Sequence, residues 1–199
     1  MVLSRLTAVL ICMALAASAR QIASVRVDEH VAVGSCELAL NGAGLHRALF
    51  FKIYVAALYL VEKQTSPAGV LALAGPKRIS ITLLRDIPAR RLVDSLMDGI
   101  HDNTSREERP HLKGRLDGLT AILMSLGRGK RGDVIAFDFL PDAGTVVLLN
   151  GEAAGTAIPG EDLYRALLRV WVGDHPGDGG LKKALLRAEP KKDRPAGVR

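Results

Sequence analysis

The sequence predicts one α+β domain, and three observations support this fold class. The chain has 199 residues, of which 48% are hydrophobic and 24% charged, as is typical of a globular protein that buries a core. Its apolar residues follow the two-residue period of strands before Pro88 and the helical period after it, and strand-like segments then return. No internal repeat or linker divides the sequence, so we expect a single domain.

The first nineteen residues read as a targeting segment rather than as part of the fold. Arg5 precedes an apolar stretch from Leu6 to Ala17, and Ala17-Ser18-Ala19 supplies small residues for cleavage after Ala19. The stretch is shorter than the roughly 20 apolar residues that a membrane-spanning helix needs. We therefore predict a signal peptide at 1–19, a domain at 20–186, and a protein that is periplasmic or secreted.

Apolar patterning predicts the strands of the first half. Residues 24–40 alternate and predict two short strands joined near His30, followed by a turn at the glycine-rich stretch 41–44. Residues 50–61 are a nearly continuous apolar run, which favours a strand covered on both faces. A short helical or irregular link at 66–74 then leads into an alternating, half-buried strand at 77–85.

Helical spacing dominates after Pro88. Apolar stripes predict two amphipathic helices, and the second ends at Gly127. Asn150-Gly151 is a strong hairpin signal and predicts that the strands around it form a three-stranded antiparallel meander. The predicted elements after Pro88 are helices through 92–100 and 112–126, strands at 133–140, 145–149 and 152–158, a helix from Gly160 to Trp171, and a short helix at 181–188.

Charge is concentrated at the C-terminus. Seven basic and two acidic residues follow Leu181, although the whole chain has a formal net charge of only +6. The basic character therefore belongs to a tail, of which we predict residues 187–199 to be disordered. We expect no nucleic-acid partner, since that would need clustered basic residues and stacking aromatics on the folded surface. A solvated end and weak contact with an anionic membrane surface both stay open for the tail.

Searches for catalytic motifs are mostly negative. Gly42-Ala43-Gly44 has Arg47 where a dinucleotide fingerprint needs its third glycine, and Gly129-Lys130 is followed by Arg131 instead of a hydroxyl residue. The five histidines lack the close spacings of metal ligands, and no serine lies in a nucleophile elbow. Cys36 has no partner outside the targeting segment, which excludes paired-thiol chemistry.

One dense segment carries a family resemblance: LNGAGLHRALFFKIYVAALYL, residues 40–60. Here the chain resembles the chalcone isomerase superfamily, and more closely its exported bacterial branch of chalcone isomerase-like proteins. Further motifs follow in the family's order, and extend the resemblance over roughly Val25 to Leu186. They are Gly75-Pro76-Lys77-Arg78, Lys130-Arg131-Gly132-Asp133, Asn150-Gly151, and the helix through Tyr164 and Trp171 to Gly173.

The resemblance implies an open-faced antiparallel β-sandwich with helices packed on one side. It also implies a cleft between sheet and helices that holds a planar aromatic or fatty ligand, and it implies no cofactor. True chalcone isomerases close a ring by attack of a phenolate oxygen on an enone. An arginine favours the phenolate, and hydroxyl and amide groups stabilise the enolate.

Matching the enzymes position by position assigns candidate ligand-binding residues. Arg47 is the best match to the arginine, with His46 as a near competitor, and Tyr54 stands where the enzymes have a strand threonine. Thr156 matches a later hydroxyl residue. The helix tyrosine and asparagine of the enzymes fall on Leu92 and Gly99, which removes two hydrogen-bonding groups, and we assign no catalytic residue.

Three hypotheses for function remain at the level of sequence. The first is a non-catalytic binder of an apolar small molecule such as a fatty acid, whose anionic headgroup would pair with Arg47. The second is an intramolecular lyase of the chalcone isomerase type acting on an unknown substrate. The third is a structural or partner-binding envelope protein.

Overall fold

The computed structural model describes residues 19–186. Residues 1–18, which make up nearly all of the predicted signal peptide, and the predicted tail at 187–199 lie outside the described residues.

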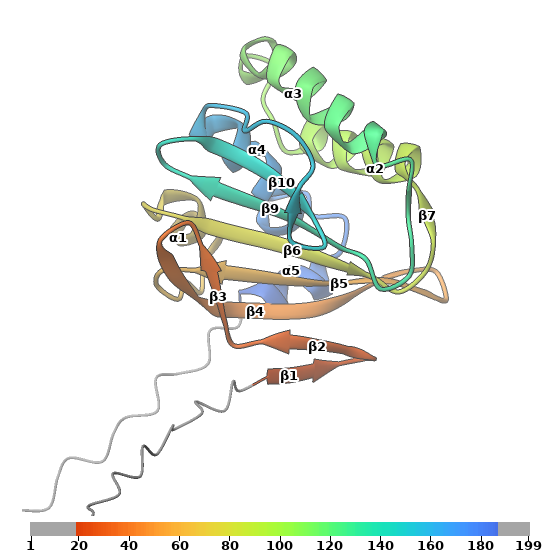
Figure 1. Ribbon diagram of the computed structural model, residues 1–199. Helices are drawn as coiled ribbons and strands as arrows, with labels where there is room; N and C mark the ends of the chain where they lie inside the picture. Colours follow the sequence, from red (N-terminus) through yellow and green to blue (C-terminus); the bar gives the residue numbers. More distant parts are fainter. Residues whose placement is uncertain (1–18, 187–199) are drawn as a thin grey trace, which may run out of the picture.

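A seven-stranded antiparallel sheet forms the framework (Figure 1). Its strand order is β11-β10-β9-β6-β5-β4-β3, while β1 pairs with β2 and β7 pairs with β8 in two small sheets. The strands are β1 Ala19–Ile22, β2 Val25–Asp28, β3 His30–Val33, β4 Cys36–Ala48, β5 Phe51–Leu60, β6 Lys77–Leu83, β7 Ile87–Pro88, β8 Arg128–Gly129, β9 Val134–Leu140, β10 Gly144–Leu149 and β11 Glu152–Ala153.

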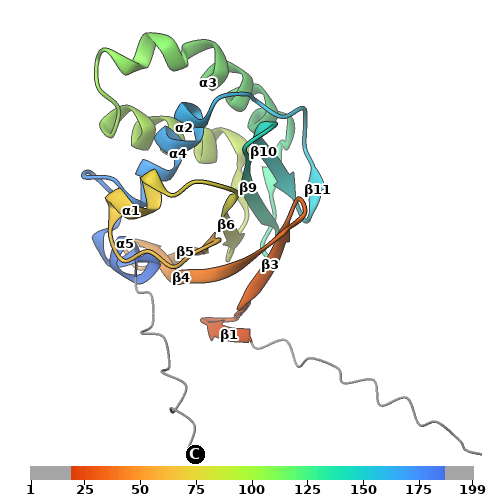
Figure 2. The same ribbon diagram turned by 90° about the vertical axis from the view of Figure 1, so that its left-hand side faces the viewer.

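The helices cover one face of the curved sheet (Figure 2). Together with the antiparallel sheet, this arrangement confirms the predicted α+β, open-faced architecture. The helices are α1 Pro67–Ala72, α2 Ala89–Asp102, α3 Glu108–Ser125, α4 Glu161–Val172 and α5 Gly179–Leu185.

The central strand β5 has a hydrophobic cluster on each face. Ala56 and Leu58 belong to the larger cluster, which the helices close from above. Val55 and Ala57 belong to a smaller cluster on the opposite face, which includes residues of β2 and β3. The prediction of a strand covered on both faces is therefore confirmed, because successive side chains of a strand point to opposite sides.

The predicted turn at 41–44 is wrong. These residues lie in the middle of β4, and the chain reverses later, at Leu49 and Phe50. A Cβ atom at Gly42 would collide with the backbone carbonyl oxygens of Ala184 and Leu185 in α5. The glycines allow a helix to pack closely on the strand. A glycine-rich stretch looks the same in the sequence whether it has this role or forms a turn.

Most other predicted elements are found. Asn150 and Gly151 both have positive φ, of 53° and 90°, as a tight hairpin turn requires. The last strand of the predicted meander is short, since β11 has two residues and Ile158 makes only an isolated bridge to Thr145.

Candidate functional site

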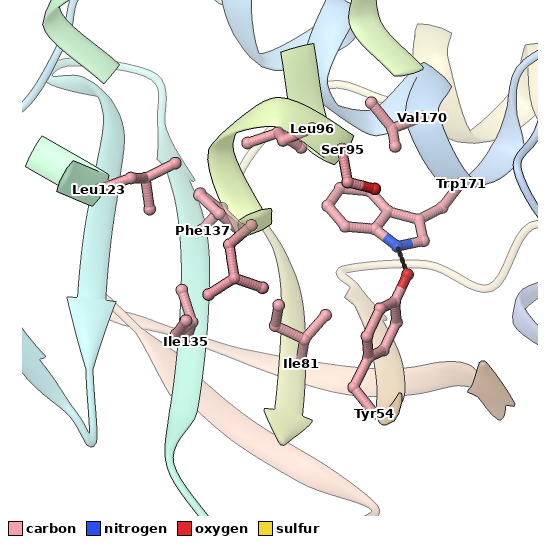
Figure 3. A pocket seen from close by; sticks show the side chains of 10 residues that line it. Tyr54, Ile81, Ser95, Leu96, Leu123, Ile135, Phe137, Val170 and Trp171 are labelled. Atoms are coloured by element: carbon pink, nitrogen blue, oxygen red, sulfur yellow. Dashed lines mark hydrogen bonds between the residues drawn. The ribbon is translucent and has the colours of Figure 1, made fainter. Parts of the chain in front are cut away.

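An apolar chamber of about 60 Å³ lies between the sheet and helices α2, α3 and α4. The strands β5, β6 and β9 form its floor, and Figure 3 shows the side chains that point into it. Its lining residues are Tyr54, Ile81, Leu92, Ser95, Leu96, Leu123, Ile135, Phe137, Val170 and Trp171. We call it the inner chamber.

Each element presents its apolar residues to this chamber by its own period. On β6 and β9 the inward residues alternate, so Ile81 and Ile135 stand on the floor. On α2, Leu92 and Leu96 are four residues apart and share one face of the helix. The chamber is therefore a gap in the larger hydrophobic cluster, and it carries few polar groups.

Tyr54 and Trp171 meet at one end of the inner chamber (Figure 3). The indole Nε1 of Trp171 donates a hydrogen bond of 3.1 Å to the hydroxyl oxygen of Tyr54. Burial raises the pKa of Tyr54 to about 12, a nearby Asp178 adds to the rise, and the bond from Trp171 only partly opposes it. The phenol is therefore protonated at neutral pH, and its own O–H is a donor for an oxygen atom of a ligand.

A second, polar chamber of about 380 Å³ adjoins the first. The two share Tyr54, Ser95, Val170 and Trp171 in their linings. We call this space the outer chamber, and its remaining lining residues are His46, Asp98, Gly99, Asp102, His175, Gly177, Asp178 and Leu181. The site thus passes from an apolar interior to an acidic and histidine-bearing mouth.

A histidine–aspartate pair stands at the outer chamber. The imidazole Nδ1 of His46 lies 3.2 Å from Asp178 Oδ2, and the His46 ring stacks on the Tyr54 ring with centroids 4.7 Å apart. Burial tends to raise the pKa of Asp178, but hydrogen bonds from the backbone of Leu181 and Gly180 and the pairing with His46 outweigh it and lower that pKa. Asp178 is also the N-cap of α5, so it fixes the helix and holds the imidazole at once.

A family profile described as "Chalcone isomerase-like" matches residues 19–187. The chain belongs to the chalcone isomerase-like family. Comparison with the sequences of curated proteins finds no match.

The chain is also similar in structure to a fatty-acid binding protein of Arabidopsis thaliana, with a TM-score of 0.66. Sequence identity is 12%, and the match covers 85% of this chain and 96% of that one. At this identity the likeness shows the fold, and it agrees with the chalcone isomerase-like architecture described above.

The structure brings together only some of the residues expected from the chalcone isomerase-like resemblance. Tyr54 lines both chambers, whereas Arg47 and Thr156 are exposed and line neither. The expected pocket beside Arg47 therefore opens beside its neighbour His46. Leu92 lines the inner chamber and Gly99 the outer one, which are the positions that would carry the tyrosine and asparagine of the enzymes.

Sequence reasoning missed two groups of this chalcone isomerase-like site. Asp178 is 132 residues from His46 in the chain, and no motif links them. Its position before a glycine pair and an apolar helix is a typical N-cap signal, which could have placed α5 but not its partner. The sequence places Trp171 only on the predicted helix that starts at Gly160, and its indole N–H is one of the polar groups of the inner chamber.

Among residues 19–186, no group of three or more His, Cys, Asp or Glu side chains is arranged to hold a metal ion. Within the same residues, none of the helices has both the length and the apolar character needed to cross a membrane.

Proposed function

We propose that this chalcone isomerase-like protein is a non-catalytic binder of an apolar small molecule, of which fatty acids are the class to test first. The inner chamber is the observation that carries the proposal. It is an apolar gap between sheet and helices whose few polar groups include the hydroxyls of Tyr54 and Ser95 and the indole N–H of Trp171. Apolar walls with few convergent polar groups are typical of small-molecule sites.

The volume of the inner chamber limits what can bind there without a change of conformation. Pockets for drug-sized ligands measure about 300–1,000 Å³, a range that the outer chamber reaches and the inner chamber, at about 60 Å³, does not. An acyl chain therefore enters the inner chamber only if α2 and α3 move away from the sheet. The backbone groups inside each helix stay paired during such opening, so only those at the helix ends have to find other partners.

The polar end of the ligand would lie in the outer chamber. Tyr54 offers its O–H there, and His46 stands beside it. Asp98, Asp102 and Asp178 line the same space and oppose a carboxylate by like charge. Since Arg47 lines neither chamber, the proposal assigns the polar contact to Tyr54 and His46.

The structural neighbour supports this choice of ligand class, since its name describes a fatty-acid binding protein. The two proteins share the fold and 12% of their residues, so the ligand of this chain needs its own test.

The fluorescence of Trp171 provides a direct test of ligand binding. Trp171 is the single tryptophan of the chain and it lines both chambers, so its fluorescence reports on the site. We expect palmitic acid and hexadecanol to change the emission in a saturable way, and the ratio of their affinities measures the effect of the headgroup charge.

A matched pair of variants tests where the acyl chain lies. Leu92→Phe fills the inner chamber and should weaken binding of palmitic acid. Leu116→Phe makes the same change on α3, at a half-buried leucine that does not line this chamber, and should leave binding unchanged. Equal binding by both variants would place the ligand elsewhere.

The His46–Asp178 pair favours a second candidate, an intramolecular lyase. An aspartate that orients a histidine is a common arrangement for a general base, here beside a pocket. Against it, Leu92 and Gly99 supply neither carbonyl-side donor, and losing one such donor typically costs about 2.7–4 kcal/mol of transition-state stabilisation. We expect no ring closure of 2′-hydroxychalcones above the buffer rate in an absorbance assay; closure that depends on His46 would favour the lyase.

We further propose that the protein is exported and cleaved after Ala19, on the strength of the apolar N-terminal segment and its small-residue site. N-terminal sequencing of the protein from its cell should begin at Arg20. A sequence that begins at Met1 would contradict export by cleavage.

A further inference from the structure

We propose that the β4–β5 hairpin tip, Leu49-Phe50-Phe51, docks the protein on the surface of an anionic lipid bilayer. This inference concerns a surface distinct from the two chambers, and it stands whether or not they bind a fatty acid.

The tip presents large apolar side chains to solvent. Leu49 is 89% exposed, Phe50 94% and Phe51 58%. Two other large apolar residues among the described ones are exposed, Val61 and Met124, and both are less so, at 43% and 41%. Scattered exposed residues are ordinary, but three in succession at a protruding turn form a patch.

The backbone of the turn is strained at Leu49. Leu49 adopts a φ of 53°, a left-handed conformation that asparagine and glycine adopt more readily than leucine. Neither local backbone preference nor burial in this chain accounts for a leucine there. Contact with an apolar environment outside the protein does account for it.

Basic residues surround the tip. Arg47 and Lys52 face each other across the two strands directly below it, and both are exposed. The Arg85 guanidinium lies 4.9 Å from the centroid of the Phe51 ring. Asp86, next in the chain, is acidic but pairs with Arg128 at 3.8 Å, so this ion pair leaves the net positive charge near the tip unchanged.

This combination matches an anionic membrane surface better than a protein partner. Apolar side chains that enter the headgroup region, with cations around them that meet lipid phosphates, are typical of interfacial binding. A stable protein interface needs about 800 Å² on each partner, which a three-residue convex tip does not provide by itself. The hairpin projects at one end of the sheet, where it can reach a flat surface (Figure 1).

The position of the tip relates docking to the chambers. His46 and Tyr54, which line the outer chamber, each lie three residues from the tip along β4 and β5. At about 3.3 Å per residue this is roughly 10 Å along the strands. A docked molecule would hold the mouth of its pocket close to the lipid headgroups.

Cosedimentation with vesicles tests the proposal. The purified protein is mixed with vesicles of phosphatidylcholine alone or of equal parts phosphatidylcholine and phosphatidylglycerol. We expect binding to the anionic vesicles, weakened by added salt because screening reduces the attraction. Every variant has the same residues as the parent at 1–18 and 187–199, so differences in vesicle binding between variants report on the tip.

Two variants separate the apolar and the charged contributions. The double change Leu49→Asn with Phe50→Ser should lower the partition coefficient at least about tenfold. It should leave the melting temperature equal or higher, since asparagine suits the positive φ. Lys52→Glu should lower binding by roughly fivefold or more at low salt.

Matched controls make the same chemical changes away from the tip. Met124→Ser removes an exposed apolar residue of α3, and Lys113→Glu reverses an exposed charge of the same helix. Both should bind like the parent. The proposal is overturned if the parent does not bind anionic vesicles, if the tip variant binds as well as the parent, or if the tip instead forms a dimer that the double change dissolves.

Discussion

Tyr54 connects the two chambers through a single hydroxyl group. Its oxygen accepts from Trp171 Nε1, its ring stacks on His46, and its high pKa keeps the O–H intact at neutral pH. A ligand oxygen in the outer chamber would accept that proton in a hydrogen bond without displacing the bond from Trp171. The residue is thus a donor held in place from two sides.

Tyr54→Phe should weaken binding of palmitic acid by about 1.5–3 kcal/mol, because a hydrogen bond to the charged carboxylate of the ligand is lost. The change keeps the ring and its stacking but leaves the buried Trp171 N–H without its acceptor, so the apo protein should lose about 1–3 kcal/mol of unfolding free energy. Tyr59→Phe is the matched control, since Tyr59 lies on the same strand in the opposite hydrophobic cluster. Fluorescence titration of Trp171 measures both; equal affinities for both variants would remove Tyr54 from the site.

Arg78 and Asp138 form an ion pair within the sheet. They are partners across β6 and β9, with Arg78 Nε and Nη2 each 2.5 Å from a carboxylate oxygen, and Asp138 is only 5% exposed. Burying such a pair is costly, so its geometry has to be good, and removing one partner leaves an uncompensated charge.

Arg78→Met should lower the free energy of unfolding by about 3–5 kcal/mol. The double variant Arg78→Met with Asp138→Leu should recover most of this loss, because no charge stays buried. Urea unfolding of the three proteins measures the effect. A single variant as stable as the parent would mean that the carboxylate is well solvated without its arginine.

At the scale of elements, the packing of α5 on β4 shapes the outer chamber. Asn41 Nδ2 donates a hydrogen bond of 2.8 Å to the Leu185 carbonyl oxygen, and the glycines of β4 leave room for the helix. The helix in turn supplies Leu181, and its N-cap supplies Asp178. The glycine-rich stretch that suggested a turn therefore positions half of the His46–Asp178 pair.

Gly42→Val should dislodge α5, because its Cβ would meet backbone oxygen atoms that cannot move aside. We expect a loss of about 1–3 kcal/mol in unfolding free energy, together with weaker ligand binding. Gly114→Ala is the opposite case, a glycine inside α3 with nothing within 4 Å of the added Cβ. It should stabilise the protein by about 0.5–1 kcal/mol. Unfolding in denaturant measures whether the free energy falls in Gly42→Val and rises in Gly114→Ala.

The strands and helices were predictable because their signals are local. The Asn150-Gly151 turn, the stripes of α2 and α4, and the apolar run of β5 each contain their own period. The candidate site was predictable only in part, since the family resemblance gives Tyr54, which lines both chambers, but favours Arg47, which lines neither, over its neighbour His46. Asp178 and Trp171 come from distant parts of the chain, and only the docking of α4 and α5 brings them to β5.

At the scale of the whole molecule, all three tyrosines titrate above their ordinary range. Burial, the largest cause in each, raises the pKa values of Tyr54 and Tyr59 to about 12 and that of Tyr164 well above 10. The folded state therefore binds phenolic protons more tightly than the unfolded chain. The resulting stability is present below pH 10 and is lost as the pH rises through 12.

An ultraviolet titration should show almost no tyrosinate in the native protein at pH 10, where about half of the phenols in denaturant are ionised. Unfolding free energy should fall from pH 10 upward. If the tyrosines of the folded protein titrate with a midpoint near pH 10, they are accessible to water, and the core around β5 does not bury them.

A crystal structure with a fatty acid brominated at its tail end would show whether an acyl chain occupies the inner chamber. We expect an anomalous bromine peak between Leu96 of α2 and Ile135 of β9, with the carboxyl end toward Tyr54. A bromine peak outside the space between sheet and helices, or a fully occupied ligand that leaves this chamber closed, would contradict it.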